Sequence, residues 1–564
     1  MDTRFLAFTI LSALSAGIAG CNPKASVTAK TATSVKTVTT TDPSWPADFP
    51  LPAEILAART NVSCRLMTET DPMTGQPGTC HRIITPGTGS PASLAMTKFI
   101  GTSQGVQPGH RICLRGGDYP YSRLWIEATV GTEAQPVEVI NCEGRFVIGN
   151  AVDADSNGQV DNSRGIEFHG VSYLKLTGSG SKDHYYGIRI DGTSNGQSAV
   201  VFSDLSTDFE GEFIEVAQSG FAGFMAKTDG NCGDTDPNNF RGGFVQRNTV
   251  FHDNYIHDVE GEGFYIGNSF FQGRTSVSGC PGVPVFSHPL VGTKVYRNRL
   301  ERIGCEAIQV GYSSLTEVYD NYIRGFGRSP FADYQNNGIQ IGGGTSGRFF
   351  NNYVINPDPS FEVSAGITII GYRDTWVYSN VVVNAGTGIY VNQAMGQGQD
   401  GQYGPYSLTL ANNTIVNPIG VPGVGGGKGI HTFNTAIPIR ILNNLILLGV
   451  PESSTSLSNH LLVNTIYDHK SGFTFWGSGL QGPNHTVSGN LRGHYAAEKS
   501  AYFVDPDQEN FSLLASSAAV DAGIDVSSHG LSTSIKPDHP NFRTLNRPRI
   551  RGTAIDVGAY EADP

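Results

Sequence analysis

One short phrase built around an asparagine recurs along the middle of the chain and constrains the fold more than any other feature. In each copy the asparagine precedes a large or β-branched residue and then an apolar one. The copies lie 23 to 44 residues apart and centre on Asn254, Asn298, Asn321, Asn352, Asn380, Asn413 and Asn444. Self-similarity at such a period is typical of a solenoid, in which each repeat is one coil and neighbouring coils share a core.

A second phrase follows most copies, with a small residue leading an apolar alternation. It reads Gly-Phe-Tyr-Ile at 263–266, Gly-Ile-Gln-Ile at 338–341 and Gly-Ile-Tyr-Val at 388–391. Period-two alternation with β-branched and aromatic residues predicts a short strand rather than a helical turn. Several short strands per repeat, joined by Gly and Asn turns, predict an all-β coil of parallel strands.

Composition agrees with this prediction and limits the partners. The 564 residues include 70 glycines and only 16% charged residues, as in a turn-rich β protein. The formal net charge of −12 argues against nucleic acid and acidic membranes as main partners. A soluble, acidic surface accounts for this charge by itself, and we expect a monomer.

The first residues are expected to be a targeting segment and not part of the fold. Arg4 precedes an apolar run over 5–18, which ends in small residues before Cys21. A charged start, a short apolar core and a small-residue cleavage site predict a secretory signal over 1–20. The run resembles a bacterial lipoprotein signal, which implies that Cys21 carries the lipid.

The lipoprotein resemblance also implies a location in the bacterial cell envelope. Asn22 after the cysteine favours a lipid anchor in the outer membrane, so the membrane is an expected partner. Residues 21–48 are rich in Thr, Ser, Ala and Lys and are interpreted as a disordered tether. Residues 49–110 are interpreted as a lead-in that caps the first coil, with a short helix between 91 and 99.

Seven cysteines remain when Cys21 is set aside, an odd number for an oxidising compartment. No Cys-x-x-Cys or Cys/His zinc spacing occurs. The cysteines are therefore interpreted as disulfide staples. Proximity in sequence suggests the pairs Cys64–Cys80, Cys113–Cys142 and Cys232–Cys280, with Cys305 left alone.

Two segments resemble a known family. The run 112–149, with a Gly131-Thr132 turn, resembles the entry coil of pectate-lyase-like right-handed β-helix proteins. The tail from Asp521-Ala522-Gly523 to Asp556-Val557-Gly558-Ala559-Tyr560-Glu561 resembles the terminal segment of bacterial secreted β-helix proteins. The resemblance covers about residues 110–561 and implies a single-stranded right-handed parallel β-helix solenoid over 111–515, closed by 516–564. The acidic residues of the tail are expected to be structural.

A loop between Asp153 and Arg164 has two interpretations. Its oxygen-bearing side chains follow the spacing of a calcium loop, with glycine at the sixth position. The twelfth position is Arg164, where that pattern needs a bidentate glutamate. The loop is therefore either a polar turn or a Ca²⁺ site formed by Asp153, Asp155, Asn157 and Asp161.

The second phrase also predicts a surface. Its apolar members should face the core, while the residues between them face outward in one column. The candidate substrate-binding residues of this column are Tyr265, Gln309, Gln340, Tyr390 and His431. Tyr312, Tyr372 and Trp376 are further aromatics that could hold sugar rings, although aromatic residues on a strand surface are also common filler.

Glu262 and Glu306 precede this phrase on neighbouring coils, about 4.8 Å apart if the coils stack. They could form the carboxyl pair of a retaining glycosidase. They could instead hold Ca²⁺ beside a uronate, as the family resemblance implies, with Lys227, Arg302 or Arg274 as the base. The third interpretation is a pair of ordinary exposed glutamates. Glu260 and the long insertions 228–243 and 268–291 lie close in sequence.

The sequence supports two functions of different classes. The first is a surface-anchored polysaccharide lyase or glycosidase that acts in a groove around Glu262 and Glu306. The second is a non-catalytic lipoprotein that binds a glycan with the same face. Lys428 and His431, beside a Gly-rich segment, form a weaker second candidate site.

Overall fold

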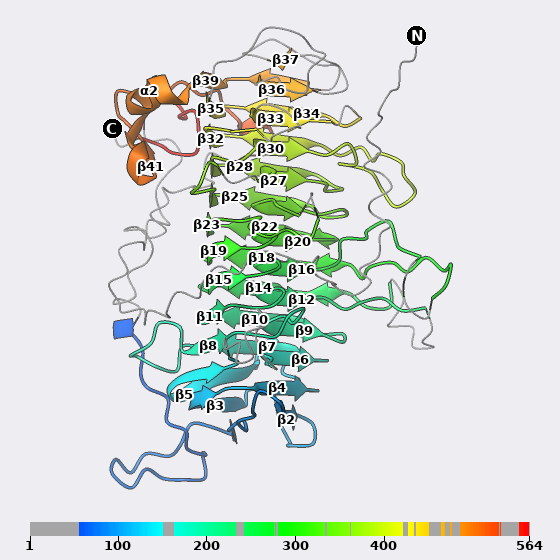
Figure 1. Ribbon diagram of the computed structural model, residues 1–564, viewed down its shortest axis with the longest axis vertical. Coiled ribbons are helices and arrows are strands. Elements are labelled where there is room, and N and C mark those ends of the chain that lie inside the picture. The colour runs from blue at the N-terminus through cyan, green and yellow to red at the C-terminus, as the bar shows by residue number, and fades with distance from the viewer. Residues whose placement is uncertain are drawn as a thin grey trace.

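The protein is described here by a computed structural model. The described residues are 56–150, 163–232, 242–275, 277, 280–332, 335–360, 363–420, 427–433, 436–449, 464–468, 474–475, 485–529, 531 and 552–562. Short strands stack along one axis, from β2 and β3 at one end to β36 and β37 at the other (Figure 1). Nearly every strand pairs in parallel with its counterpart on the next coil, which confirms the predicted all-β parallel β-helix.

Each coil contributes two strands to the larger sheet. That sheet has 23 strands. They are β1 (Arg82–Ile84), β3 (Arg111–Tyr119), β5 (Val137–Ile148), β7 (Ser172–Thr177), β8 (Ile188–Asp191), β10 (Thr207–Glu212), β11 (Ile214–Ala217), β14 (Thr249–His252), β15 (Tyr255–Val259), β18 (Lys294–Tyr296), β19 (Arg299–Ile303), β22 (Thr316–Tyr319), β23 (Tyr322–Arg324), β25 (Gly347–Phe350), β26 (Tyr353–Ile355), β28 (Thr375–Tyr378), β29 (Val381–Val383), β31 (Leu408–Ala411), β32 (Thr414–Val416), β34 (Ile439–Leu442), β35 (Leu445–Leu448), β38 (His485–Ser488) and β39 (Leu491–His494).

A second sheet takes one strand from most coils and is the one that carries the candidate site. It comprises β2 (Ala95–Ile100), β4 (Ser122–Glu127), β6 (Ile166–His169), β9 (Val200–Ser203), β12 (Phe224–Ala226), β16 (Phe264–Ile266), β20 (Ile308–Val310), β24 (Ile339–Ile341), β27 (Ala365–Ile369), β30 (Thr387–Val391), β33 (Lys428–Thr432), β36 (Asn464–Asp468) and β37 (Thr474–Phe475). The smaller elements are β13 (Gln246–Arg247), β17 (Leu290–Val291), β21 (Ser313–Ser314), α2 (Tyr495–Tyr502), β40 (Phe503–Asp505), β41 (Asn510–Leu513) and two 3₁₀ turns, η3 (Pro506–Gln508) and η4 (Ser527–His529).

The core lies inside the coil and follows the apolar positions of both phrases. Phe264 on β16, Ile308 on β20 and Ile339 on β24 stack in register and are fully buried. On the larger sheet, Phe251 and Val295 do the same. Because each residue meets an equivalent one on the next coil, an apolar column runs through the whole coil as one continuous core.

The repeated asparagines form the internal ladder that their spacing predicts. The Asn352 amide donates to Oδ1 of Asn380 at 2.9 Å, and Asn380 donates to Asn413 at 3.0 Å. Each Oδ1 also accepts the backbone N–H of the asparagine before it in the ladder, as for Asn352 N to Asn380 at 3.0 Å. The ladder continues to Asn490, which accepts from Asn444 at 2.9 Å and was not predicted.

The coil begins earlier than predicted. Residues 95–100 form strand β2, so the helix expected between 91 and 99 is wrong. β2 pairs with β4, and β1 pairs with β3. The alternation Ala-Met-Thr-Lys-Phe-Ile over 95–100 is a strand pattern, and this segment pairs as a strand with the next coil.

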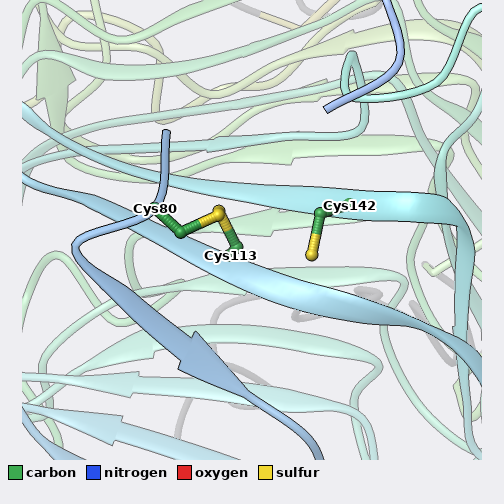
Figure 2. Close-up of side chains that lie close together, drawn as sticks. All are labelled: Cys80, Cys113 and Cys142. Carbon is green, nitrogen blue, oxygen red and sulfur yellow. A yellow bond between two sulfur atoms is a disulfide. The ribbon is translucent and has the colours of Figure 1, made fainter. Parts of the chain in front are cut away.

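Two of the three predicted disulfide pairings are also wrong. Cys64 bonds Cys142, and Cys80 bonds Cys113. Figure 2 shows the Cys80–Cys113 bond with Cys142 beside it, on neighbouring strands of the first coils. These four cysteines therefore pair with the cysteine that lies beside them on a neighbouring coil, and not with the nearest cysteine in the sequence. The pair Cys232–Cys280 is confirmed, and Cys305 is buried and belongs to none of the disulfides of the described residues.

The C-terminal segment packs on the outside of the larger sheet. α2, β40 and β41 lie beside the upper coils (Figure 1), where their apolar residues join Tyr353, Val383 and Leu447 in one cluster. Asp556 accepts the N–H groups of Asp521 and Ala562 at 2.7 Å each. The acidic residues of the tail thus serve a structural role, as expected. No helix among the described residues is long and apolar enough to cross a membrane.

Candidate functional site

The predicted outward column exists on the second sheet. We call Tyr265, Gln309, Gln340, Thr368, Tyr390 and His431 the strip; they are in register on six successive coils. Gln340 donates to Oε1 of Gln309 at 3.2 Å, and Gln309 donates to Oγ of Ser269 at 3.0 Å. Tyr265 and Gln309 are buried, whereas Gln340, Tyr390 and His431 are partly exposed.

Glu262 and Glu306 lie beside the strip on neighbouring coils, as their spacing predicts. The N–H of Gly263 donates to the carbonyl of Glu306 at 3.1 Å, which joins the two coils. A Cβ at Gly263 would lie 2.4 Å from Leu300 in the core, so position 263 faces inward. The Asn337 amide contacts Oε1 of Glu306 at 3.5 Å, and Thr368 of the strip donates to Asn337 at 2.7 Å. Asn337 and Thr368 thus connect the glutamate pair to the strip through side-chain contacts.

Both glutamates are buried, which contradicts the interpretation of ordinary exposed residues. Glu262 is 2% exposed and Glu306 is 0% exposed. Burial raises the pKa of Glu262 to about 7. Burial, and then the neighbouring charge of Glu262, raise the pKa of Glu306 well above its ordinary value. Oε2 of each carboxyl has no hydrogen-bond partner among the described residues. A low-dielectric site with two such carboxyls retains at least one proton at neutral pH.

Lys227 lies close to the pair, but its ammonium group is already bonded to other side chains. Its Nζ contacts Asp229 at 3.0 Å and Asn268 at 3.3 Å, and it lies 5.1 Å from the ring centre of Tyr265. Burial lowers the pKa of Lys227, but its interactions with the neighbouring Tyr265 and Asp229 outweigh burial, so the pKa is raised. Lys227 is therefore protonated at neutral pH and unsuited to remove a proton.

Two further predicted catalytic residues have different positions. Glu260 is exposed and lies two residues before Glu262, at the edge of the site. Arg302 lies on the outer face of the larger sheet, where Nε donates to Asp258 at 2.6 Å. Its prediction as a base at the Glu262 site is therefore wrong, because Asp258 holds it on the larger sheet, whereas Glu262 lies beside the second sheet.

Three aromatic rings, contributed by different coils, form a cluster at the pair. Phe221 meets Tyr265 edge-on with ring centres 6.0 Å apart, and it stacks on Phe331 at 6.0 Å. Sequence reasoning missed Phe221 and Phe331 because they lie in connections outside the repeated phrases. Trp376, considered for sugar stacking, lies on β28 of the larger sheet and not at the strip.

A second cluster of aromatic rings forms around Phe271, which lies in the insertion 268–291. Phe271 packs against Tyr312 with ring centres 5.0 Å apart and against Tyr372 at 5.6 Å. The side chain of Gln399 also donates to the carbonyl of Phe271 at 3.3 Å. Residues 271 and 399 are therefore in contact, and Tyr312 and Tyr372 both pack on Phe271; their role in holding sugar rings stays a prediction.

The Lys428–His431 candidate lies four coils from Glu306 on the same sheet. Lys428 is buried on β33, and burial lowers its pKa. His431 contacts the ring of Tyr390 edge-on at 5.5 Å and that of Phe433 at 4.9 Å. The strip thus ends in an aromatic cluster with a lysine beside it.

The predicted calcium ligands Asp153, Asp155, Asn157 and Asp161 lie outside the described residues. A different group, Glu210, Glu212 and His252, brings three ligand atoms within 4.8 Å of one another. Lys175 already bonds Glu210 at 2.7 Å and Glu212 at 2.8 Å. Ca²⁺ prefers several free oxygen ligands, so these residues fit an ammonium group better than Ca²⁺.

Two repeated charge networks flank the bend at Asn254 and were not predicted. In the first, His252 contacts Asp253 at 2.5 Å and Glu210 at 3.0 Å. In the second, His257 contacts Asp258 at 2.6 Å and Glu215 at 3.3 Å. Burial lowers the pKa of each histidine, but the hydrogen bonds to its two carboxylates outweigh it, so both pKa values are raised. We call these networks the histidine staples.

Comparison with known proteins gives structural neighbours only. No protein-family model and no curated protein matches the chain. The pectate lyase Pel9A matches with a TM-score of 0.42 at 14% identity, over 86% of this chain and 97% of that one. An alginate lyase from Paenibacillus sp. str. FPU-7 matches with a TM-score of 0.40 at 15% identity, over 63% and 99%. The GH136 lacto-N-biosidase from Eubacterium ramulus matches with a TM-score of 0.39 at 12% identity, over 74% and 68%.

Proposed function

We propose that the protein is a polysaccharide-active enzyme that hydrolyses glycosidic bonds with the Glu262–Glu306 pair. The observation that carries the proposal is the burial of two carboxyls on adjacent coils, with the pKa of Glu262 raised to about 7. Perturbed pKa values in a pair of titratable groups are typical of acid–base catalysis. The strip beside the pair offers aromatic, amide and hydroxyl groups for sugars.

The two carboxyls can divide the chemistry between them. Lys227 lies where its charge favours the ionised form of Glu262, so we place the proton of the singly ionised pair on Glu306. Glu306 would then protonate the glycosidic oxygen while the Glu262 carboxylate attacks the anomeric carbon. Water would cleave the resulting glycosyl ester, with Glu306 accepting its proton. A spacing of one coil, about 4.8 Å, suits a retaining pair.

Hydrolysis is better supported than β-elimination. An eliminating enzyme needs a base beside the sugar carbon, and Lys227 is held protonated by its ion pair with Asp229. Lys227 would instead stabilise the negative charge of the ionised pair, because its charge lowers the pKa of Glu262 against the effect of burial. Both carboxyls are covered, so substrate binding must displace side chains above them.

The test is product analysis with the purified chain on a polysaccharide panel. We expect new reducing ends without the ultraviolet absorbance of an unsaturated uronate. Glu262→Gln and Glu306→Gln should each lower turnover by at least about a hundredfold. Glu317→Gln, on the larger sheet, is the control and should keep full activity. Unchanged turnover in both variants, or absorbance that requires Ca²⁺, would overturn the hydrolytic proposal.

The second candidate is a non-catalytic glycan-binding protein. The partial exposure of Gln340, Tyr390 and His431 on the strip favours it, since binding there needs no access to the buried carboxyls. Retention on a glycan column with no new product would support this candidate over the enzyme.

We also propose that the chain is anchored in the bacterial outer membrane through Cys21. The apolar run before this cysteine supports the anchor. Metabolic labelling with a tagged fatty acid should mark the wild type and not Cys21→Ser. Equal labelling of both proteins would contradict the anchor.

A further inference from the structure

The strip next to the glutamate pair carries no charge on five successive coils. From β16 to β30 its members are Tyr265, Gln309, Gln340, Thr368 and Tyr390. In the row beside it, Asn337, Ala365 and Thr387 follow the two glutamates along the coils. Among the described strand residues of these five coils, neither row supplies a cation, and Lys428 is the first one beyond them.

This charge distribution opposes a polyuronate. Such a polymer carries one carboxylate per sugar and would meet the ionised carboxylate of the glutamate pair without matching cations on the strands. The nearest ammonium group, that of Lys227, is bonded to Asp229. Juxtaposed like charges cost binding free energy, and the cost is larger in a partly buried site.

Phe331 adds an exposed apolar surface beside the glutamate pair. It is 47% exposed, and one face of its ring rests on Phe221. Phe221 in turn lies over the chain next to Glu262, because a Cβ at Gly261 would be 2.8 Å from its ring. The N–H of Ser329 donates to the carbonyl of Gly304 at 2.9 Å, which holds the connection that carries Phe331 beside the coil of Glu306. The free face of an aromatic ring suits the C–H face of a sugar.

We infer that the strip binds an uncharged glycan, with Phe331 as the platform for one of its sugar rings. This inference rests on the proposed function and specifies the class of its substrate. It assigns Phe331 to binding and not to chemistry, so the side chain should affect affinity more than turnover.

The test measures binding to matched neutral and acidic glycans. The probes are a neutral β-glucan oligosaccharide with the uronate made by oxidising its primary hydroxyls, and homogalacturonan with and without its methyl esters. The full chain carrying Glu306→Gln is used, because this variant should cleave the probes at least about a hundredfold more slowly and keeps the Glu262 carboxylate. We expect retention of at least one neutral probe, with binding at least about tenfold weaker for its acidic partner.

Substitution at position 331 separates the platform from general surface effects. In the same background, Phe331→Ala should weaken binding of the retained neutral probe about three- to tenfold. Leu315→Ala, which removes another exposed apolar side chain, is the matched control and should leave binding unchanged. Stronger binding of an acidic probe, no retention of any neutral probe, or unchanged binding by Phe331→Ala would overturn the inference.

The two proposals fail in distinguishable ways. If the wild type binds a neutral probe through Phe331 but releases no reducing ends, hydrolysis is wrong and the substrate class stands. If the wild type hydrolyses the acidic probes in preference, the enzyme stands and the neutral substrate is wrong.

Discussion

At the residue scale, the glutamate pair should make stability depend on pH. A carboxyl whose pKa is raised on folding binds its proton more tightly in the native state. Its contribution is therefore fully present below the unfolded pKa, near 4.5, and is lost as pH rises toward about 7 and beyond. A shift of this size in Glu262 corresponds to a loss on the order of 3 kcal/mol.

Denaturant unfolding at pH 5 and pH 8 checks this dependence. Glu262→Gln and Glu306→Gln should each reduce the difference in unfolding free energy between the two pH values, because a neutral amide has no proton to lose. Glu133→Gln, at an exposed turn, is the control. Equal pH dependence in the wild type and both pair variants would show that ionisation of the pair does not change the free energy of unfolding.

The sequence could place these residues but not their environment. Strand register alone put Glu262 and Glu306 on adjacent coils beside the strip, as the structure confirms. Burial could not be predicted, because Phe221 and Phe331 come from connections that carry no periodic pattern. For the same reason, the sequence did not predict Phe331 as a binding residue.

At the scale of the strands and their bends, the asparagine ladder should contribute strongly to stability. The Asn352 amide donates to Asn380 and to the carbonyls of Val318 and Phe350, and its Oδ1 accepts from Asn321. Asn352→Ala leaves buried donors and acceptors without partners and should cost about 2–4 kcal/mol of unfolding free energy. Gln76→Ala, which removes an exposed amide, should cost less than about 0.5 kcal/mol. Similar midpoints for the two variants would contradict the ladder's role.

The histidine staples join three coils and predict a second pH effect. The pKa of His257 is raised on folding, so its stabilisation is present below the unfolded value, near 6.5, and is lost as pH rises through the folded value. His257→Gln should cost about 2 kcal/mol at pH 6 and less at alkaline pH. Arg145 and Arg189, which contact Glu215, and Arg302, which contacts Asp258, remain in this variant.

Unfolding curves of His257→Gln and His110→Gln at several pH values test the staple. Burial lowers the pKa of His110, so removing that histidine should change the pH dependence in the opposite direction. A cost for His257→Gln that does not vary with pH would mean that His257 is neutral in the native state.

The strands themselves were the most predictable elements. Apolar alternation located the second-sheet strands of 264–266, 339–341 and 389–391, since the core accepts only one orientation of each. Asn490 escaped prediction because 46 residues separate it from Asn444, further than any other step of the ladder. Periodicity in the sequence therefore predicts the regular coils, but it does not predict a coil that follows a long insertion.

At the scale of the whole molecule, contacts between distant segments were the least predictable. Cys64 pairs with Cys142 across 78 residues because the coil returns the chain to the same side. The C-terminal segment likewise covers the larger sheet, where Arg324 contacts Glu509 at 3.3 Å. A repeat pattern defines what each coil looks like, but not which loop or terminal segment covers it.

The Glu262–Glu306 pair beside the strip should keep one proton at neutral pH. Infrared difference spectra of the wild type against Glu306→Gln at pH 7 measure this proton. We expect a protonated carboxylic acid band in the wild type that is absent from the variant and disappears at alkaline pH. A difference spectrum at pH 7 that shows only ionised carboxylate would mean that the pair holds no proton and supplies no catalytic acid.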